Sequence, residues 1–203
     1  MAEEKITGVI LAGGKNSRMG TDKAFIEING VSMIRRTVEL FRDIFDEIVI
    51  VTNSPLLYLD QNVVLVTDIF PGKGALGGLY TGLFFSSHSR AFVCACDMPF
   101  LNGPFIQYMI QKSSGYDIVV PDYGDGVQPL HAIYRKKYLP SIRKLLDQGK
   151  LKISDLYMGH KMLIIKADLI KSFDETGKMF LNVNTSEDLR QIQPLCKVMH
   201  CPE

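Results

Sequence analysis

Three cationic side chains and two adjacent glycines lie in one short loop near the start of the chain. The loop reads Leu-Ala-Gly-Gly-Lys-Asn-Ser-Arg-Met-Gly-Thr-Asp-Lys over residues 11–23 and follows a short apolar run. Adjacent glycines allow a sharp turn whose backbone N–H groups stay exposed, and phosphate oxygens bind such donors. Lys15, Arg18 and Lys23 add positive charge to the same loop. This combination after a strand predicts a site for nucleotide phosphates.

The spacing of this loop excludes the two best-known phosphate-binding motifs. A Walker A loop needs a glycine, four further residues and then Gly-Lys-Ser/Thr, whereas residues 20–22 read Gly-Thr-Asp. The dinucleotide fingerprint Gly-x-Gly-x-x-Gly is absent here and occurs later, at residues 72–77, where Pro71 separates it from the preceding strand. Asp97 follows about 20 residues later, where a ribose-binding acid would lie. An NAD(P)-binding oxidoreductase therefore stays open as an alternative.

Polar side chains follow three further predicted strands. Asp97 comes directly after the apolar run 91–96, and Asp68 and Asn53 follow two shorter runs rich in Val and Ile. In parallel α/β sheets ligands bind beyond the carboxyl ends of the strands, so these side chains are expected to meet the glycine loop at one rim. An unpaired carboxylate is costly to bury, and Mg²⁺ prefers carboxylate oxygen with water and phosphate. Asp97 is therefore the candidate metal ligand.

Apolar runs alternate with helical patterns along the chain. Ser32 and Asn102 are N-cap residue types, and Pro121 is expected to end a strand at 117–120. Alternation of apolar strands with helices predicts an α/β fold of three layers, a Rossmann-like, mostly parallel sheet with helices on both faces. The predicted strands are 6–11, 47–52, 63–66, 91–96, 117–120, 130–135 and 162–165, and the predicted helices are about 32–45, from 74, from 102, and 137–148.

The overall composition is that of an ordinary globular chain. It has 203 residues, of which 46% are hydrophobic and 22% charged, with a formal net charge of +1. So small a net charge does not favour binding to nucleic acid or to an anionic membrane. No apolar run approaches the roughly 20 residues of a membrane span. The amino terminus lacks a signal peptide's apolar core, so a cytoplasmic protein is expected. We expect one domain over 1–195, with a nucleotide-binding part at about 6–100, an acceptor-binding part at about 101–190, and a loose tail at 196–203.

The glycine loop resembles the signature of nucleotidyltransferases that activate a small phosphorylated or sugar substrate with a nucleoside triphosphate. Within that group, Gly13-Gly14 and residues 19–23 are similar to the molybdenum cofactor guanylyltransferases, whereas the related cytidylyltransferases usually carry Ala-Ala-Gly at the turn. The resemblance runs from about residue 6 to about residue 189. It also includes Cys-Asp-Met-Pro at 96–99, the second glycine-rich segment 71–79, Gln-Pro-Leu-His at 128–131, and Asn-Val-Asn-Thr at 182–185.

The resemblance implies a nucleotide-diphospho-sugar transferase-like fold and a reaction. GMP passes from GTP to the terminal phosphate of molybdopterin, and pyrophosphate leaves. Mg²⁺ is the implied cofactor, and other molybdenum cofactor proteins are candidate partners, with neither nucleic acid nor membrane expected to bind. The implied catalytic residues are Arg18, Lys23 and Asp97, with Asp97 as the metal ligand; nucleotide contacts are implied for Leu11, Ala12, Gly13, Gly14, Lys23, Asn53, Asp68 and Asp97, and acceptor contacts for His131, Asn182 and Asn184.

The backbone N–H groups of Ala12, Gly13 and Gly14 are expected to line the triphosphate. Two rival functions accompany this interpretation. A cytidylyl- or other nucleotidyltransferase on the same fold is the first, and the oxidoreductase is the second. A non-catalytic nucleotide sensor is disfavoured because Lys23 and Asp97 are both present.

Overall fold

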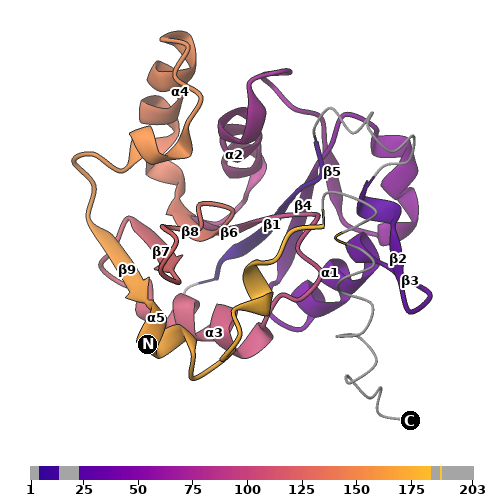
Figure 1. Ribbon diagram of the computed structural model, residues 1–203. Coiled ribbons are helices and arrows are strands. Elements are labelled where there is room, and N and C mark those ends of the chain that lie inside the picture. Colours follow the sequence, from indigo (N-terminus) through magenta and orange to yellow (C-terminus); the bar gives the residue numbers. More distant parts are fainter. Residues whose placement is uncertain (1–4, 14–22, 184–187, 189–203) are drawn as a thin grey trace.

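A mixed sheet forms the middle layer of the molecule (Figure 1). The computed structural model describes residues 5–13, 23–183 and 188, and within them seven strands pair in the order β5-β4-β1-β6-β8-β7-β9. Strand β8 runs antiparallel to β6 and β7, and the other pairs are parallel. The mostly parallel sheet is therefore confirmed. The strands are β1 (Thr7–Leu11), β4 (Glu47–Val51), β5 (Val64–Val66), β6 (Arg90–Ala95), β7 (Ile118–Asp122), β8 (His131–Arg135) and β9 (Met162–Lys166).

Helices cover both faces of this sheet, as predicted. Figure 1 shows α2 (Gly74–Phe85) and α4 (Leu139–Asp147) on one face, and α1 (Met33–Arg42), α3 (Gly103–Lys112) and α5 (Ala167–Ile170) on the other. Both expected N-caps are present, since the Ser32 side chain accepts from the Arg35 N–H and the Asn102 side chain from the Phe105 N–H. The remaining short elements are the hairpin β2 (Glu27–Ile28) and β3 (Val31–Ser32), and the 3₁₀ turns η1 (Lys23–Phe25), η2 (Pro55–Gln61), η3 (Lys136–Tyr138), η4 (Ile153–Leu156) and η5 (Lys178–Phe180).

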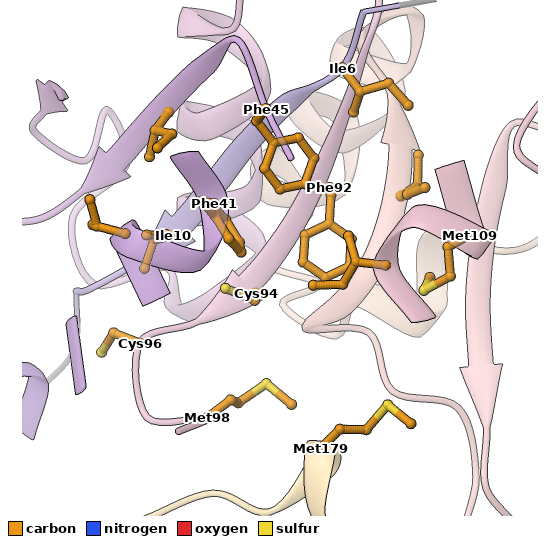
Figure 2. Close-up of a cluster of buried hydrophobic side chains, with 14 of the residues drawn as sticks. Ile6, Ile10, Phe41, Phe45, Phe92, Cys94, Cys96, Met98, Met109 and Met179 are labelled. Carbon is orange, nitrogen blue, oxygen red and sulfur yellow. The ribbon is translucent and has the colours of Figure 1, made fainter. Parts of the chain in front are cut away.

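Each strand of the sheet sends alternate side chains into two separate cores. On the face of α2 and α4, Val9 and Leu11 pack with leucines of α2. On the other face, the rings of Phe41, Phe45 and Phe92 lie together, with centroid separations of 4.8 to 5.9 Å (Figure 2). Two buried layers of this kind fix the strand register, because a slip of one residue would exchange the two faces. The register in turn fixes which residues reach the carboxyl rim.

Two predicted element boundaries are wrong. Helix α1 ends at Arg42 rather than near residue 45, and Pro121 lies inside β7 instead of ending it. Strand β7 pairs with β8 only through Ile118 and Val119, so the missing N–H of Pro121 interrupts no bond of that ladder. None of the helices among the described residues is long and apolar enough to cross a membrane.

Gly8 allows α1 to pack closely on β1. A Cβ atom at residue 8 would lie 2.6 Å from a ring carbon of Phe41 and 2.6 Å from one of Phe45, and both rings are buried. Gly8→Ala is therefore expected to lower the free energy of unfolding by about 1–3 kcal/mol through overpacking, and Tm by about 3–10 °C. Thermal melting measures the change. An unchanged Tm would show that α1 can shift away from β1 without loss of stability.

Candidate active site

The carboxyl ends of β1, β4 and β6 open into a pocket of about 630 Å³. Six of the predicted site residues share this pocket: Leu11, Gly13, Lys23, Asn53, Asp68 and Asp97. The chain brings them together because parallel strands end at the same edge of the sheet. Further lining comes from residues that the sequence did not single out individually: Val51, Gly72, Gly74, Ala75, Gly78, Ala95, Cys96 and Leu130.

One of the three backbone N–H groups expected to be exposed after β1, that of Ala12, is already hydrogen-bonded. Ala12 is buried, and its N–H donates to the Val51 carbonyl at 2.8 Å. The expected phosphate contact from the Ala12 N–H is therefore wrong for this structure, because the sheet ladder extends one residue beyond β1. Gly13 is exposed, and its N–H makes no hydrogen bond among the described residues. Gly14 and Arg18 lie outside the described residues.

Lys23 and Asp97 are two half-buried groups of opposite charge in the same pocket. Lys23 begins η1, and Asp97 follows the end of β6. Burial raises the pKa of the Asp97 carboxyl, and the nearby Lys23 ammonium partly lowers it again. One carboxylate oxygen, Oδ1, is buried and has no hydrogen-bond partner within the described part of the chain. Such an oxygen is costly to leave unpaired, which makes it a suitable ligand for a cation.

The surroundings of Asp97 suit a Mg²⁺ ion that takes most of its ligands from the phosphates of a bound nucleotide. Over residues 5–13, 23–183 and 188, no cluster of three or more His, Cys, Asp or Glu side chains could hold a metal ion. Mg²⁺ commonly binds to one or two carboxylates and completes its shell with water and phosphate oxygens. One carboxylate beside Lys23 therefore suits a metal that arrives with a triphosphate, rather than a site made by protein ligands alone.

The other end of the pocket holds Asn53 and Asp68. The Asp68 Oδ1 atom accepts hydrogen bonds from the Phe70 N–H at 3.0 Å and from the Thr81 hydroxyl at 2.9 Å. The Asn53 side chain lies beside Gly13, since a Cβ at residue 13 would be 3.7 Å from its Nδ2 atom. Because the strand order is β5-β4-β1-β6, Asp68 after β5 and Asn53 after β4 lie toward one end of the pocket, and Asp97 after β6, with Lys23 nearby, lies toward the other.

The second glycine-rich segment forms part of the pocket wall. Gly72 and Gly74 adopt φ angles of +78° and +63°, which glycine adopts readily, and α2 begins at Gly74. A Cβ at residue 78 would lie 3.3 Å from the Leu11 side chain, so Gly78 allows α2 to approach β1 closely. The first residues of α2, Gly74 and Ala75, therefore line the pocket with little side-chain bulk.

Comparison with known proteins identifies the family. Residues 8–161 match a family model described as a MobA-like NTP transferase domain. The chain belongs to the MobA-like NTP transferase family. It is 37% identical over 196 residues to a molybdenum cofactor guanylyltransferase of Desulfosudis oleivorans, covering 96% of this chain and 97% of that protein. It is 38% identical over 192 residues to a probable molybdenum cofactor guanylyltransferase of Peptoclostridium acidaminophilum, covering 91% and 87%.

The fold of this NTP transferase agrees with that of a solved structure. The molybdopterin-guanine dinucleotide biosynthesis protein A of Archaeoglobus fulgidus superposes with a TM-score of 0.82 over 96% of this chain and 100% of that chain, at 23% sequence identity. The nucleotide-diphospho-sugar transferase-like fold is therefore confirmed. Family membership makes the chain a nucleotidyltransferase and sets aside the oxidoreductase suggested by the glycines of 72–77.

His131 lies in the core of the transferase rather than in the pocket. Its side chain on β8 is fully buried, and its ring packs against Phe92, Phe105 and Phe180 with centroid separations of 5.1 to 5.7 Å. Burial lowers its pKa to about 3, so the imidazole is neutral at physiological pH. The expected direct contact of His131 with an acceptor is therefore not made by this conformation. Its neighbour Leu130 lines the pocket instead.

The segment with Asn182 lies beside the Asp97 loop. The Val183 N–H donates to the Asp97 carbonyl at 2.9 Å, and Val183 is buried against Ile28 and Met33. Asn182 itself is exposed. Asn184 and the expected tail at 196–203 lie outside the described residues. The hydrogen bond at Val183 brings one predicted acceptor residue close in space to the candidate metal ligand, although 85 positions separate Asp97 from Asn182 in the sequence.

Proposed function

We propose that this nucleotidyltransferase transfers GMP from GTP to the terminal phosphate of molybdopterin, forms the guanine dinucleotide form of the molybdenum cofactor, and releases pyrophosphate. The observation that carries the proposal is the pocket that unites Lys23, Asp97 and Gly13 in a chain with relatives of that named activity. A direct test combines the protein with GTP, Mg²⁺ and molybdopterin. Pyrophosphate release together with a guanine dinucleotide product is the expected result.

The proposed reaction is a displacement at phosphorus. An oxygen of the acceptor phosphate forms a bond to the α-phosphorus of GTP, the bond from that phosphorus to the bridging β-oxygen breaks, and pyrophosphate carries away the electron pair. Such transfers depend on positioning and on neutralisation of charge rather than on a protein nucleophile. The pocket supplies both, because the Lys23 ammonium and the N–H of Gly13 can hold phosphate oxygens in place.

Asp97 is the proposed ligand of Mg²⁺, through its buried carboxylate oxygen. When bound, the ion neutralises charge on the triphosphate. The backbone of Asp97 is bonded to Val183, so an acceptor bound at Asn182 would lie at the same end of the pocket. Asn182, with the amide of Asn184, is therefore proposed to hold the pterin, whose edge consists of hydrogen-bond donors and acceptors.

GTP is expected to bind at least about tenfold more tightly than CTP or ATP. Guanine offers two adjacent N–H donor groups on one edge, and the Asp68 carboxylate and Asn53 side chain at the end of the pocket away from Lys23 and Asp97 can accept from them. One hydrogen bond to a charged group contributes about 1.5–3 kcal/mol, which corresponds to about tenfold or more in Kd. Calorimetry with Mg²⁺ present compares the three nucleotides. A preference for CTP would assign the chain to the cytidylyltransferases.

A further inference from the structure

We infer that Thr81 is a positioning residue that sets the orientation of the Asp68 carboxylate for binding of the nucleoside. This role deepens the proposed function and rests on it, since it assumes that a nucleoside triphosphate occupies the pocket. Thr81 does not line the pocket itself. It lies on α2, fully buried, directly behind Asp68.

The Thr81 hydroxyl connects three parts of the structure. It lies 2.9 Å from Asp68 Oδ1 and 3.1 Å from the Gly77 carbonyl, and it accepts from the Ile69 N–H at 3.0 Å. A hydroxyl has one proton to donate, and an ionised carboxylate is a stronger acceptor than a carbonyl. The proton is therefore directed to Asp68, while the Ile69 N–H holds the hydroxyl oxygen in place.

These contacts leave one carboxylate oxygen of Asp68 for a ligand. The Oδ1 atom already accepts from Thr81 and from the Phe70 N–H, whereas Oδ2 has no hydrogen bond or ion pair among the residues that the structure describes. Rotation of the carboxylate would break both Oδ1 bonds. Because Asp68 lines the pocket, the fixed orientation leaves Oδ2 to accept from a donor of the bound nucleoside, either a base N–H or a ribose O–H.

Thr81 should therefore affect nucleotide binding much more than the chemical step. The phosphates are expected at the other end of the pocket, near Lys23 and Asp97, whereas the Thr81 hydroxyl bonds only to Asp68, Ile69 and Gly77 among the described residues. Without its hydroxyl, Asp68 keeps only the Phe70 N–H as a donor and can rotate. A disordered acceptor weakens binding of the nucleotide in the ground state and in the transition state by the same amount. KM therefore rises and kcat stays nearly unchanged.

The test compares Thr81→Val, Thr81→Ser and a matched control, Thr37→Val. Thr37 is also a buried helical threonine, and its hydroxyl bonds to the Met33 carbonyl at 3.1 Å, but it does not line the pocket. Thr81→Val is expected to raise the Kd and KM for the nucleotide about tenfold with kcat changed less than about threefold. Thr81→Ser should restore both constants. Thr37→Val should lower Tm comparably and leave both constants unchanged, so a loss of affinity in it would overturn the inference.

A double variant decides whether Thr81 acts through Asp68. Asp68→Asn should weaken binding, and Thr81→Val combined with Asp68→Asn should bind no more weakly than Asp68→Asn alone. If the fold-loss of affinity in the double variant equals the product of the losses in the two single variants, the positioning role is overturned. Inosine triphosphate, which lacks the 2-amino group, tests that group as the donor, and 2′-deoxy-GTP tests the ribose 2′-hydroxyl. An analogue that lacks the bonded donor should bind equally to the wild type and to Thr81→Val, and if both analogues still lose affinity in Thr81→Val the donor is the base N1–H or the ribose 3′-hydroxyl.

The wild-type measurements separate this role from the proposed function. If the wild-type protein binds CTP or ATP better than GTP, guanylyl transfer fails as the proposed function. The comparison of Thr81→Val with Thr37→Val then uses the preferred nucleotide. A tenfold difference confined to Thr81→Val would still support the positioning role, and no difference would overturn it.

Discussion

Lys23→Ala is expected to lower kcat/KM for nucleotidyl transfer by about 10²–10³-fold. Lys23 lies in the pocket with Asp97, where removal of one preorganised donor to a developing negative charge typically has an effect of this size. Lys112→Ala is a suitable control, because that lysine lies on α3 over the Tyr108 ring and does not line the pocket. Steady-state kinetics with GTP and Mg²⁺ provides the measurement. Normal turnover of Lys23→Ala would show that the phosphates bind elsewhere.

The same variant should also change the pH profile. The Lys23 ammonium lowers the pKa of the Asp97 carboxyl against the larger opposing effect of burial. Removal of that cation therefore raises the pKa further, and the carboxylate needed for a metal is lost at a higher pH. The acidic limb of the residual kcat/KM profile should shift to higher pH in Lys23→Ala and stay near its original position in Lys23→Arg. An unshifted limb would mean that Asp97 does not control it.

Asp97→Asn is expected to reduce Mg²⁺-dependent transfer by about a thousandfold. The asparagine side chain would keep the size of the aspartate but lose the charge that binds the ion, and metal stabilisation of transition-state charge amounts to several kcal/mol. The backbone bond from Val183 to the carbonyl of residue 97 remains. Kinetics over a range of Mg²⁺ concentrations tests this result. Retained activity with normal Mg²⁺ dependence would remove Asp97 from the proposed metal site.

The same substitution should raise Tm slightly in the metal-free protein at neutral pH. Because burial raises the pKa of Asp97 above its unfolded value, the folded state binds the proton more tightly, and stability falls as pH rises through the folded pKa. Asparagine removes that destabilising charge.

Asp122→Asn is the opposite case, since the bond to Lys166 at 2.8 Å lowers the pKa of Asp122. Asp122→Asn should therefore lower Tm slightly and leave activity unchanged. If Asp97→Asn instead fails to fold, Asp97 is a structural residue.

Local sequence signals predicted most of the fold. Ser32 and Asn102 cap helices because a short side-chain oxygen can reach an unpaired N–H of the first turn, which requires no distant contact. Alternation of apolar strands and helices predicted the parallel sheet, and the parallel sheet predicted that Asn53, Asp68 and Asp97 would share a rim. These inferences depend on chain order and residue type, and both are present in the sequence.

Tertiary structure decided the features that depend on a partner far away in the chain. The Ala12 N–H is occupied because β4 lies beside β1, and His131 is enclosed because aromatic rings from β6, α3 and η5 converge on β8. Thr81 reaches Asp68 only because α2 folds back over the end of β5. Residue types and chain order predicted which groups could do chemistry and at which edge of the sheet they lie. Packing determined which of their hydrogen-bonding atoms are already used, because that depends on distances between residues that are remote in the sequence.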